Sequence, residues 1–356
     1  LHDALPIWPD VALTVGQSEP VNYAVRNAVA DLTQFKDYPE IEKRFSASAM
    51  LSLSFGGGVF GLPETETFPM MFYRKDILSE LGVKLPETWD DVLSLLHTLQ
   101  QKQMNFGLPS IAATAPEASM TLYTMLLYQN GGALYTDGGR ASLLDSKESI
   151  DSLVFIGSLY NDYRIPAEIS FLNRFRSGST PIGIADYMLY NQLSVFAPEL
   201  EGLWGFAPVP GTVGQDKAVN HSVANSVAAC IILKKSQKQK QAWEYIKWWT
   251  GAKIQAQFGR ELESVLGTAA RYPTANLEAL SQIPWDSESQ SRIQEQWKWA
   301  RGIPEVPGSY YTPRYVGFAF RDTVNLQKDP GELLIKHAAS VNREIKEKRR
   351  EFGLTD

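Results

Sequence analysis

Three short blocks in the first third of this chain carry its clearest structural signal. They read Gly58-Val59-Phe60-Gly61-Leu62-Pro63, then Phe72-Tyr73-Arg74-Lys75-Asp76-Ile77-Leu78, and then Pro86-Glu87-Thr88-Trp89-Asp90-Asp91-Val92. The third block predicts a helix from Trp89 to about Gln103, because Thr88 is suited to the N-cap and two acidic residues follow it in the first turn. Leucines continue this helix at helical spacing, so Trp89 is expected to pack in the core rather than against a ligand.

The rest of the chain alternates short apolar stretches with helical patterns. Residues 10–15 read as a buried strand, a polar loop follows, and the spacing predicts a helix over 21–32. Farther on, residues 121–129 predict a helix that ends at two glycines, and residues 147–163 predict another. Alternation of this kind is typical of an α/β fold.

Three more blocks appear in a fixed order along the chain. They are Phe175-Arg176-Ser177-Gly178 with the strand-like residues 181–186, then Gly205-Phe206-Ala207-Pro208-Val209-Pro210-Gly211, and then Ala242-Trp243-Glu244-Tyr245-Ile246-Lys247-Trp248-Trp249. Together with the first blocks, their order and spacing resemble the family 1 extracellular solute-binding proteins. These proteins are the substrate-binding subunits of bacterial ABC importers for carbohydrates, and the resemblance extends over residues 9–352.

The resemblance implies an α/β, two-lobed periplasmic-binding-protein-like fold of type II that closes on its ligand by hinge bending. The N-terminal lobe is expected to comprise 1–66 and 226–285, and the C-terminal lobe 70–220 and 300–356. Crossovers between the lobes are expected near 64–70, 218–226 and 272–305, and the resemblance implies that a loop between Pro63 and Tyr73 crosses the cleft. The first lobe is expected to be incomplete, because the match begins at what resembles the family's third strand and the chain does not begin with Met. Residues 1–7 fit no family pattern.

The resemblance also implies partners and a location. A carbohydrate ligand and the permease subunits of an ABC importer are expected, with the protein monomeric and extracellular or periplasmic. Membrane attachment is expected only through a lipid anchor on the missing N-terminal part. The chain has no apolar run approaching the ~20 residues that a membrane-spanning helix needs.

Composition argues against several other classes of protein. With 34 basic and 40 acidic residues the net charge is −6, which disfavours a nucleic-acid surface. The four histidines are scattered and there is one cysteine, so neither a catalytic metal nor another cofactor is expected. The segment 56–61 matches G-x-G-x-x-G, but Leu62-Pro63 follows where a dinucleotide site needs a helix.

Two other classes of function remain open at this stage. An enzyme on the same fold would act on a glycan through paired carboxylates, for which Glu66, Glu117 and Asp186 are candidates, or through Cys230. Cys230 lies in an apolar run, where burial would make the thiol inert. An adhesion or scaffold module would have no cleft and no affinity for small molecules.

Sugar binding needs polar side chains for the hydroxyl rim and aromatic rings for the C–H faces. The resemblance places candidates for these contacts at strand ends and on crossovers. They are Gln17, Ser18, Glu19, Glu66, Thr67, Asp186, Tyr187, Tyr190, Asn220, His221, Tyr310, Tyr311 and Arg314. Structural roles compete with this interpretation: Asp186 is equally suited to capping a helix over 187–196, and Tyr310 and Tyr311 to packing against a crossover.

Glu66 is the strongest single candidate. It is expected on a loop with no helix to cap, where its carboxylate would accept hydroxyl hydrogen bonds worth roughly 1.5–3 kcal/mol each. The sequence therefore predicts that Glu66→Ala weakens sugar binding at least about tenfold and leaves the melting temperature almost unchanged.

Overall fold

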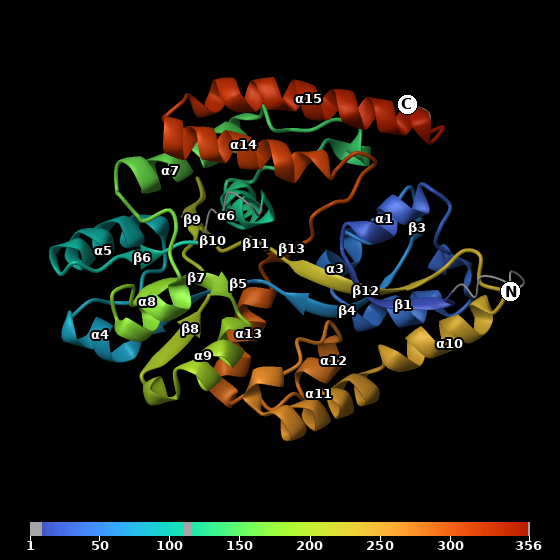
Figure 1. Ribbon diagram of the computed structural model, residues 1–356, viewed down its shortest axis with the longest axis horizontal. Helices are drawn as coiled ribbons and strands as arrows, with labels where there is room; N and C mark the ends of the chain where they lie inside the picture. The colour runs from blue at the N-terminus through green and yellow to red at the C-terminus, as the bar shows by residue number, and fades with distance from the viewer. Residues whose placement is uncertain (1–8, 110–115, 355–356) are drawn as a thin grey trace, which may run out of the picture.

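The chain has two lobes, each built on its own β-sheet (Figure 1). The computed structural model describes residues 9–109 and 116–354. The first-lobe sheet has the order β1-β12-β4 and is antiparallel, with bounds β1 (Val11–Gly16), β12 (Ser226–Ile232) and β4 (Leu62–Thr67). The second-lobe sheet has the order β6-β7-β5-β8, with bounds β6 (Phe106–Gly107), β7 (Ile182–Asp186), β5 (Pro69–Arg74) and β8 (Trp204–Ala207). The expected two-lobed α/β fold is therefore confirmed.

Short helices and one long helix pair cover the first-lobe sheet. They are α1 (Glu19–Ala24), α2 (Tyr38–Ile41), α3 (Ala47–Leu51), α10 (Gln239–Trp249), α11 (Ala252–Leu266) and α12 (Leu277–Leu280). A hairpin and three 3₁₀ turns complete the lobe: β2 (Ser54–Phe55), β3 (Gly58–Val59), η1 (Leu32–Gln34), η2 (Glu42–Arg44) and η5 (Thr268–Ala270). Its core joins Leu62 and Ile232 of the sheet to Trp243 and Ile246 of α10.

The expected helix over 21–32 is wrong. Only α1 forms, because Asn27 adopts a positive φ of 55° and turns the chain out of the helix. Val29 then forms an isolated bridge to Leu233, which extends the sheet instead. The apolar spacing that predicted a helix reflects this edge pairing.

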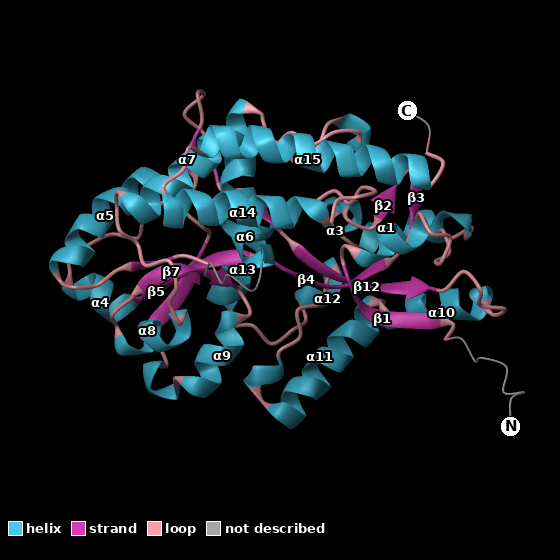
Figure 2. Cartoon of the chain, turned by 45° about the horizontal axis from the view of Figure 1, so that its top comes forward, coloured by secondary structure: helices cyan, strands magenta, loops and turns pink. Residues whose placement is uncertain are grey.

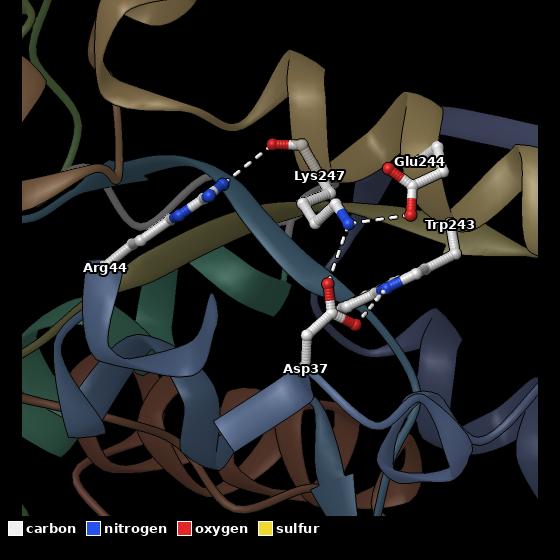
Figure 3. Close-up of polar contacts among 5 residues, drawn as sticks. All are labelled: Asp37, Arg44, Trp243, Glu244 and Lys247. Atoms are coloured by element: carbon white, nitrogen blue, oxygen red, sulfur yellow. Dashed lines mark hydrogen bonds and ion pairs between the residues drawn. The ribbon is translucent and has the colours of Figure 1, made fainter. Parts of the chain in front are cut away.

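A polar network fixes α10 to the segment 37–44 of the first lobe (Figure 3). Asp37 accepts hydrogen bonds from Trp243 Nε1 at 2.8 Å and Lys247 Nζ at 2.7 Å. Lys247 also pairs with Glu244, and Arg44 donates to the Lys247 carbonyl at 2.7 Å. The hydrogen bond from Lys247 is the main cause of a lowered pKa at Asp37, so the aspartate is held ionised.

Helices surround the second-lobe sheet. They are α4 (Lys75–Glu80), α5 (Trp89–Gln101), α6 (Pro116–Gln129), α7 (Lys147–Asn161), α8 (Phe171–Ser177), α9 (Leu189–Phe196), α13 (Ser287–Trp297), α14 (Tyr311–Leu326) and α15 (Pro330–Glu351). The smaller elements are η3 (Asp137–Gly139), η4 (Pro198–Leu200), β9 (Thr212–Val213) and β10 (Val219–Asn220). None of the helices in the described residues is long and apolar enough to cross a membrane.

Helix α5 confirms the prediction made for its sequence. Thr88 Oγ1 accepts from the Asp91 backbone N–H while the Asp91 side chain accepts from that of Thr88, which forms a capping box. Trp89 is 4% exposed, and its indole N–H donates to Gln129 Oε1 at 2.8 Å. The tryptophan is therefore a core residue, as expected.

Helices α14 and α15 run side by side over the second lobe, and α15 extends toward the first (Figures 1 and 2). At its far end the Arg26 guanidinium lies 5.2 Å from the ring centroid of Phe352. A cation–π contact of this kind joins the C-terminal helix to the lobe that contains α1.

The chain passes between the lobes at three places. Phe68 alone separates β4 from β5, and Asn225 alone separates β11 (Val223–Ala224) from β12. The third passage is segment 281–286, because α12 packs on α11 whereas α13 packs on β8. After α13 the short β13 (Ala300–Arg301) pairs in parallel with β11.

The loop expected between Pro63 and Tyr73 is two strands. β4 and β5 occupy this stretch, and only Phe68 lies between them. Glu64 and Glu66 of β4 are both buried, and their carboxylates accept hydrogen bonds from distant parts of the chain.

Candidate ligand-binding site

A cavity of about 1150 Å³ lies where the ends of the two sheets meet. The first lobe and the passages contribute residues 16–18, Thr65, Thr67 and 224–228 to its lining. The second lobe contributes Leu108 and Thr124, the end of β7 and the loop that leads into α14. A volume near the upper end of ordinary ligand pockets, about 300–1,000 Å³, suits a ligand larger than a single small ring.

Six of the predicted contacts line this cavity: Gln17, Ser18, Thr67, Asp186, Tyr310 and Arg314. Gln17 is held in place because its side-chain oxygen accepts from the Val227 backbone N–H at 2.9 Å. Tyr310 is 42% exposed, and its ring lies 4.5 Å from that of Tyr311. These residues come from segments far apart in the sequence, and the fold brings them together.

Asp186 is the carboxylate at the end of β7. It is exposed toward the cavity, and its Oδ1 accepts from the Met188 backbone N–H at 2.8 Å in a turn that precedes α9. The surrounding cavity wall raises the pKa of its carboxyl by desolvation, and a hydrogen bond with Thr67 opposes this shift. Asp186 therefore lines the cavity as expected, but it does not cap the following helix, because α9 begins at Leu189 with Met188 at its N-cap and without a side-chain capping bond.

Seven predicted contacts do not line the cavity: Glu19, Glu66, Tyr187, Tyr190, Asn220, His221 and Tyr311. Asn220 and His221 bind backbone oxygens instead. The Asn220 amide donates to the carbonyls of Tyr128 and Gln129, and His221 Nδ1 lies 2.7 Å from the Val209 carbonyl. Their polar groups are thus used in holding the second passage in place.

Tyr190 lies on the other side of α9 from the main cavity and borders a second one of about 400 Å³. Its ring packs edge-on against Trp285 and stands 4.9 Å from the guanidinium carbon of Arg271. Arg271 is in turn paired with Glu263 at 2.6 Å. Because successive residues of a helix point in different directions, Tyr190 faces Trp285 and Arg271 rather than the main cavity.

Glu66 has no exposed surface and does not line the cavity, which corrects its expected place on a loop. Its carboxylate accepts from Ser46 Oγ at 3.1 Å and from Asn225 Nδ2 at 2.6 Å. Buried Tyr187 donates its hydroxyl to the Glu66 carbonyl at 3.0 Å. Glu66 therefore joins the first lobe, the second passage and the start of α9 at one point beneath the cavity floor.

Glu305 is the cavity residue that sequence reasoning missed most clearly. It lies in the loop between β13 and α14, lines the cavity, and is only 8% exposed. Its Oε2 accepts from Ser309 Oγ at 2.6 Å. In sequence it lies between Pro304 and Pro307, a few residues before the predicted contacts Tyr310 and Tyr311, and no local pattern marks it as a cavity residue.

Other unpredicted lining residues supply rings, hydroxyls and amides. They include Thr65, Phe68, Thr124, Tyr135, Phe171 and Gln192. Tyr135 Oη donates to Thr312 Oγ1 at 2.8 Å, which fixes its ring in the wall. Most of these residues are ordinary core or strand types, so their positions at the cavity surface depend on how the lobes meet.

The two buried glutamates predict how stability depends on pH. Burial raises the pKa of Glu66 to about 7 and that of Glu305 to about 8, from an ordinary 4.5. The folded protein then keeps protons that the unfolded chain has released, so both groups favour folding below the ordinary value and lose this contribution as pH rises through 7 and 8. We expect the free energy of unfolding to fall by on the order of 6 kcal/mol between pH 5 and pH 8.5.

Urea denaturation at a series of pH values measures this dependence. The double variant Glu66→Gln/Glu305→Gln should show a flatter profile over the same range. A wild-type stability that rises from pH 5 to pH 8.5 would contradict the assignment of these two groups.

The surroundings of Cys230 do not suit the cysteine nucleophile of an enzyme on this fold. Its thiol is fully buried in β12, and its pKa is raised well above the ordinary value by desolvation and by Glu64, whose Oε2 lies 3.7 Å from Sγ. A nucleophilic cysteine needs the opposite environment, open and next to a positive charge.

The side chain of Glu117 lies outside the described residues, and Glu66 is turned away from the cavity. In the described part of the chain, no three metal-ligating side chains gather in one place.

Known proteins share this architecture over nearly the whole chain. The sugar-binding protein MalE from Xanthomonas citri superimposes with a TM-score of 0.80 at 17% identity, covering 98% of this chain and 87% of that one. A cyclic alpha-maltosyl-1,6-maltose binding protein from Arthrobacter globiformis gives 0.78 at 16% identity, with coverages of 95% and 85%. An ABC transporter solute binding protein from Thermotoga lettingae, bound with alpha-D-tagatose, gives 0.74 at 16% identity with the same coverages. At these identities the likeness concerns the fold.

Comparison of sequences adds the family to this likeness in fold. Proteins of Brucella abortus and Brucella suis that are named as binding proteins are 23% identical over 217 residues, which is 58% of this chain and 50% of theirs. The chain thus spans about half the length of these curated relatives. The family model for bacterial extracellular solute-binding protein matches residues 9–256, which is more than half of the chain. The interlobe cavity, the shared architecture and this match together show that the chain belongs to the bacterial extracellular solute-binding protein family.

Proposed function

We propose that this protein binds a sugar or oligosaccharide between its lobes and delivers it to an ABC importer, without covalent chemistry. The observation that carries the proposal is the composition of the interlobe cavity. A carboxylate at Asp186 and the side chains of Gln17 and Thr67 lie beside the rings of Tyr135 and Tyr310. Polar groups for hydroxyls and rings for C–H faces are what a sugar requires.

Several features of known relatives support the proposal. The family is one of extracellular binding proteins, and the superimposed proteins named above include a sugar-binding protein and one bound with a sugar. We propose that the lobes close on the ligand by bending at Phe68, Asn225 and segment 281–286, where the chain passes between them. A monomer that a lipid anchor tethers outside the cell, and that contacts the permease subunits, remains part of this proposal.

Calorimetry against mono- and oligosaccharides tests the function. At least one member is expected to bind with micromolar or tighter affinity. In that background Asp186→Asn should weaken binding about tenfold, since a charge-assisted hydrogen bond is replaced by a neutral one while the turn to Met188 is kept.

The matched control is Asp90→Asn, an exposed aspartate on α5 that does not line the cavity. It should leave affinity unchanged. If no sugar binds while a nucleotide or a metal ion does, the proposed function is wrong.

A further inference from the structure

Glu305 is a buried carboxylate that faces a ligand cavity without a cation. Its hydrogen-bond partner is the hydroxyl of Ser309, and the charge that acts on it from nearby is the like charge of Glu19. Among the residues that the structure describes, no Lys, Arg or His side chain forms an ion pair with it. The position therefore combines a carboxyl group, low exposure and access to the cavity.

Two other buried charges in the same molecule form ion pairs. Arg74 forms two hydrogen bonds with Asp76, and Arg271 forms two with Glu263. Buried ions are normally paired in this way because an unpaired one loses its hydration without compensation. The buried glutamates of the described residues, Glu64, Glu66 and Glu305, form no ion pair, and of these only Glu305 lines the cavity, where a bound molecule can supply a cation.

The charges around the cavity favour the same kind of partner. Of the described residues that line it, Asp186 and Glu305 are the acidic ones and Arg314 is the basic one. Arg314 is exposed, and its guanidinium lies 5.7 Å from the ring centroid of Tyr311, which does not line the cavity. When Glu305 is ionised, the wall carries one more negative than positive charge, which favours a cationic ligand over an anionic one.

Aromatic rings lie next to this carboxylate. Tyr135 is close enough for the charge of Glu305 to act on its hydroxyl, and both residues line the cavity. Phe68, Phe171 and Tyr310 add further rings to the wall. A carboxylate and aromatic rings in the wall of one cavity suit an ammonium group, which gains from an ion pair and from the electron-rich face of a ring.

We propose that the ligand carries an ammonium group that pairs with Glu305, so that the preferred ligand is an amino sugar rather than a neutral or an acidic one. This inference rests on the proposed function and narrows its ligand class. Glu305 acts as a residue that determines specificity by contact with the ligand.

Proton exchange gives this pairing its own signature. Burial raises the pKa of Glu305 to about 8, so at pH 6.5 the free protein holds a proton there. An ammonium group favours the ionised carboxylate, and its binding therefore releases that proton to solvent. A neutral sugar has no such requirement and should bind with little proton release.

Matched probes separate the classes by charge alone. Glucose, glucosamine and glucuronate form one set, galactose, galactosamine and galacturonate a second, and cellodextrins with fully deacetylated chitosan oligomers a third. Calorimetry at pH 6.5 in two buffers of different ionisation enthalpy gives the affinity and the number of protons released. Within the set that binds best, the amino member is expected to bind at least about tenfold more tightly than the neutral one, with proton release, and the uronate most weakly.

Glu305→Gln should remove the preference, so that amino and neutral members bind within about threefold of each other without proton release. Glutamine keeps an acceptor for Ser309, and circular dichroism confirms the fold. Glu347→Gln, an exposed glutamate on α15, is the control and should leave the ranking unchanged.

The outcomes are distinct. Neutral or acidic members that bind as tightly as amino members would overturn the inference while sugar binding stands. If no member of any set binds, both the inference and the proposed function fall. An amino preference that survives in Glu305→Gln would show that another residue pairs with the ammonium group and would overturn the role of Glu305.

Discussion

Gly183→Ala is expected to lower the free energy of unfolding by about 3 kcal/mol, the upper part of the usual range for overpacking a core. Gly183 lies in the middle of β7, paired with Phe72 of β5 on one side and Gly107 of β6 on the other. An added Cβ would lie 2.6 Å from both the Cα and the carbonyl oxygen of Gly107, and 2.6 Å from the ring of Phe171. Because two of these atoms are backbone, the methyl group fits only if β6 moves away from β7.

Urea denaturation of the variant and the wild type measures this loss. Gly16→Ala is the matched control, since no heavy atom lies within 4 Å of the Cβ it would add. The control should change stability by less than about 0.5 kcal/mol. Phe171 also lines the cavity, so the variant should bind ligand more weakly as well. A variant as stable as the wild type would contradict the close packing of β6 on β7.

Glu66→Ala is expected to destabilise the protein by about 2–3 kcal/mol, because it leaves buried donors without an acceptor. Ser46 Oγ and Asn225 Nδ2 both donate to this carboxylate, which has no exposed surface. The sequence had predicted the reverse, a loss of affinity with almost unchanged stability. The burial of the side chain is the reason for the change of expectation.

Glu66→Gln separates the hydrogen bonds from the charge. Glutamine keeps an oxygen that can accept from Asn225, and burial already raises the pKa of Glu66 to about 7, so near neutral pH the carboxyl is partly protonated. Its expected cost is below about 1 kcal/mol. Equal losses for the Ala and Gln variants would show that these hydrogen bonds do not stabilise the point where the passages meet.

Local signals in the sequence determined several elements correctly. The helix α5 follows from Thr88, its acidic first turn and its leucine spacing, all of which act within a few residues of one another. The order of the family-like blocks likewise led to a two-lobed α/β fold before any contact was known. Capping and spacing act between neighbouring residues, and the order of motifs is a property of the sequence, so neither requires knowledge of tertiary contacts.

The candidate site could be predicted only in part. Strand ends and loops did supply cavity residues, among them Gln17, Asp186 and Tyr310. The reason is that ligand clefts in α/β proteins form beyond the ends of the strands. The sequence did not show in which direction each side chain points. Tyr190 and Asp186 lie four residues apart, yet one faces the second cavity and the other the first.

By itself, then, the sequence determined the fold class, the strong helices and the family, because these depend on periodicity, capping and the order of motifs. Only the tertiary structure decided two points. Glu66 is a buried residue whose hydrogen bonds hold the first lobe to the second passage, and Glu305 is a carboxylate on the cavity wall. The physical reason is that a glutamate on a loop and a glutamate in a buried strand look alike in sequence. What separates them is the hydrogen-bond partner, and for Glu66 that partner is Asn225, which lies 159 residues away along the chain.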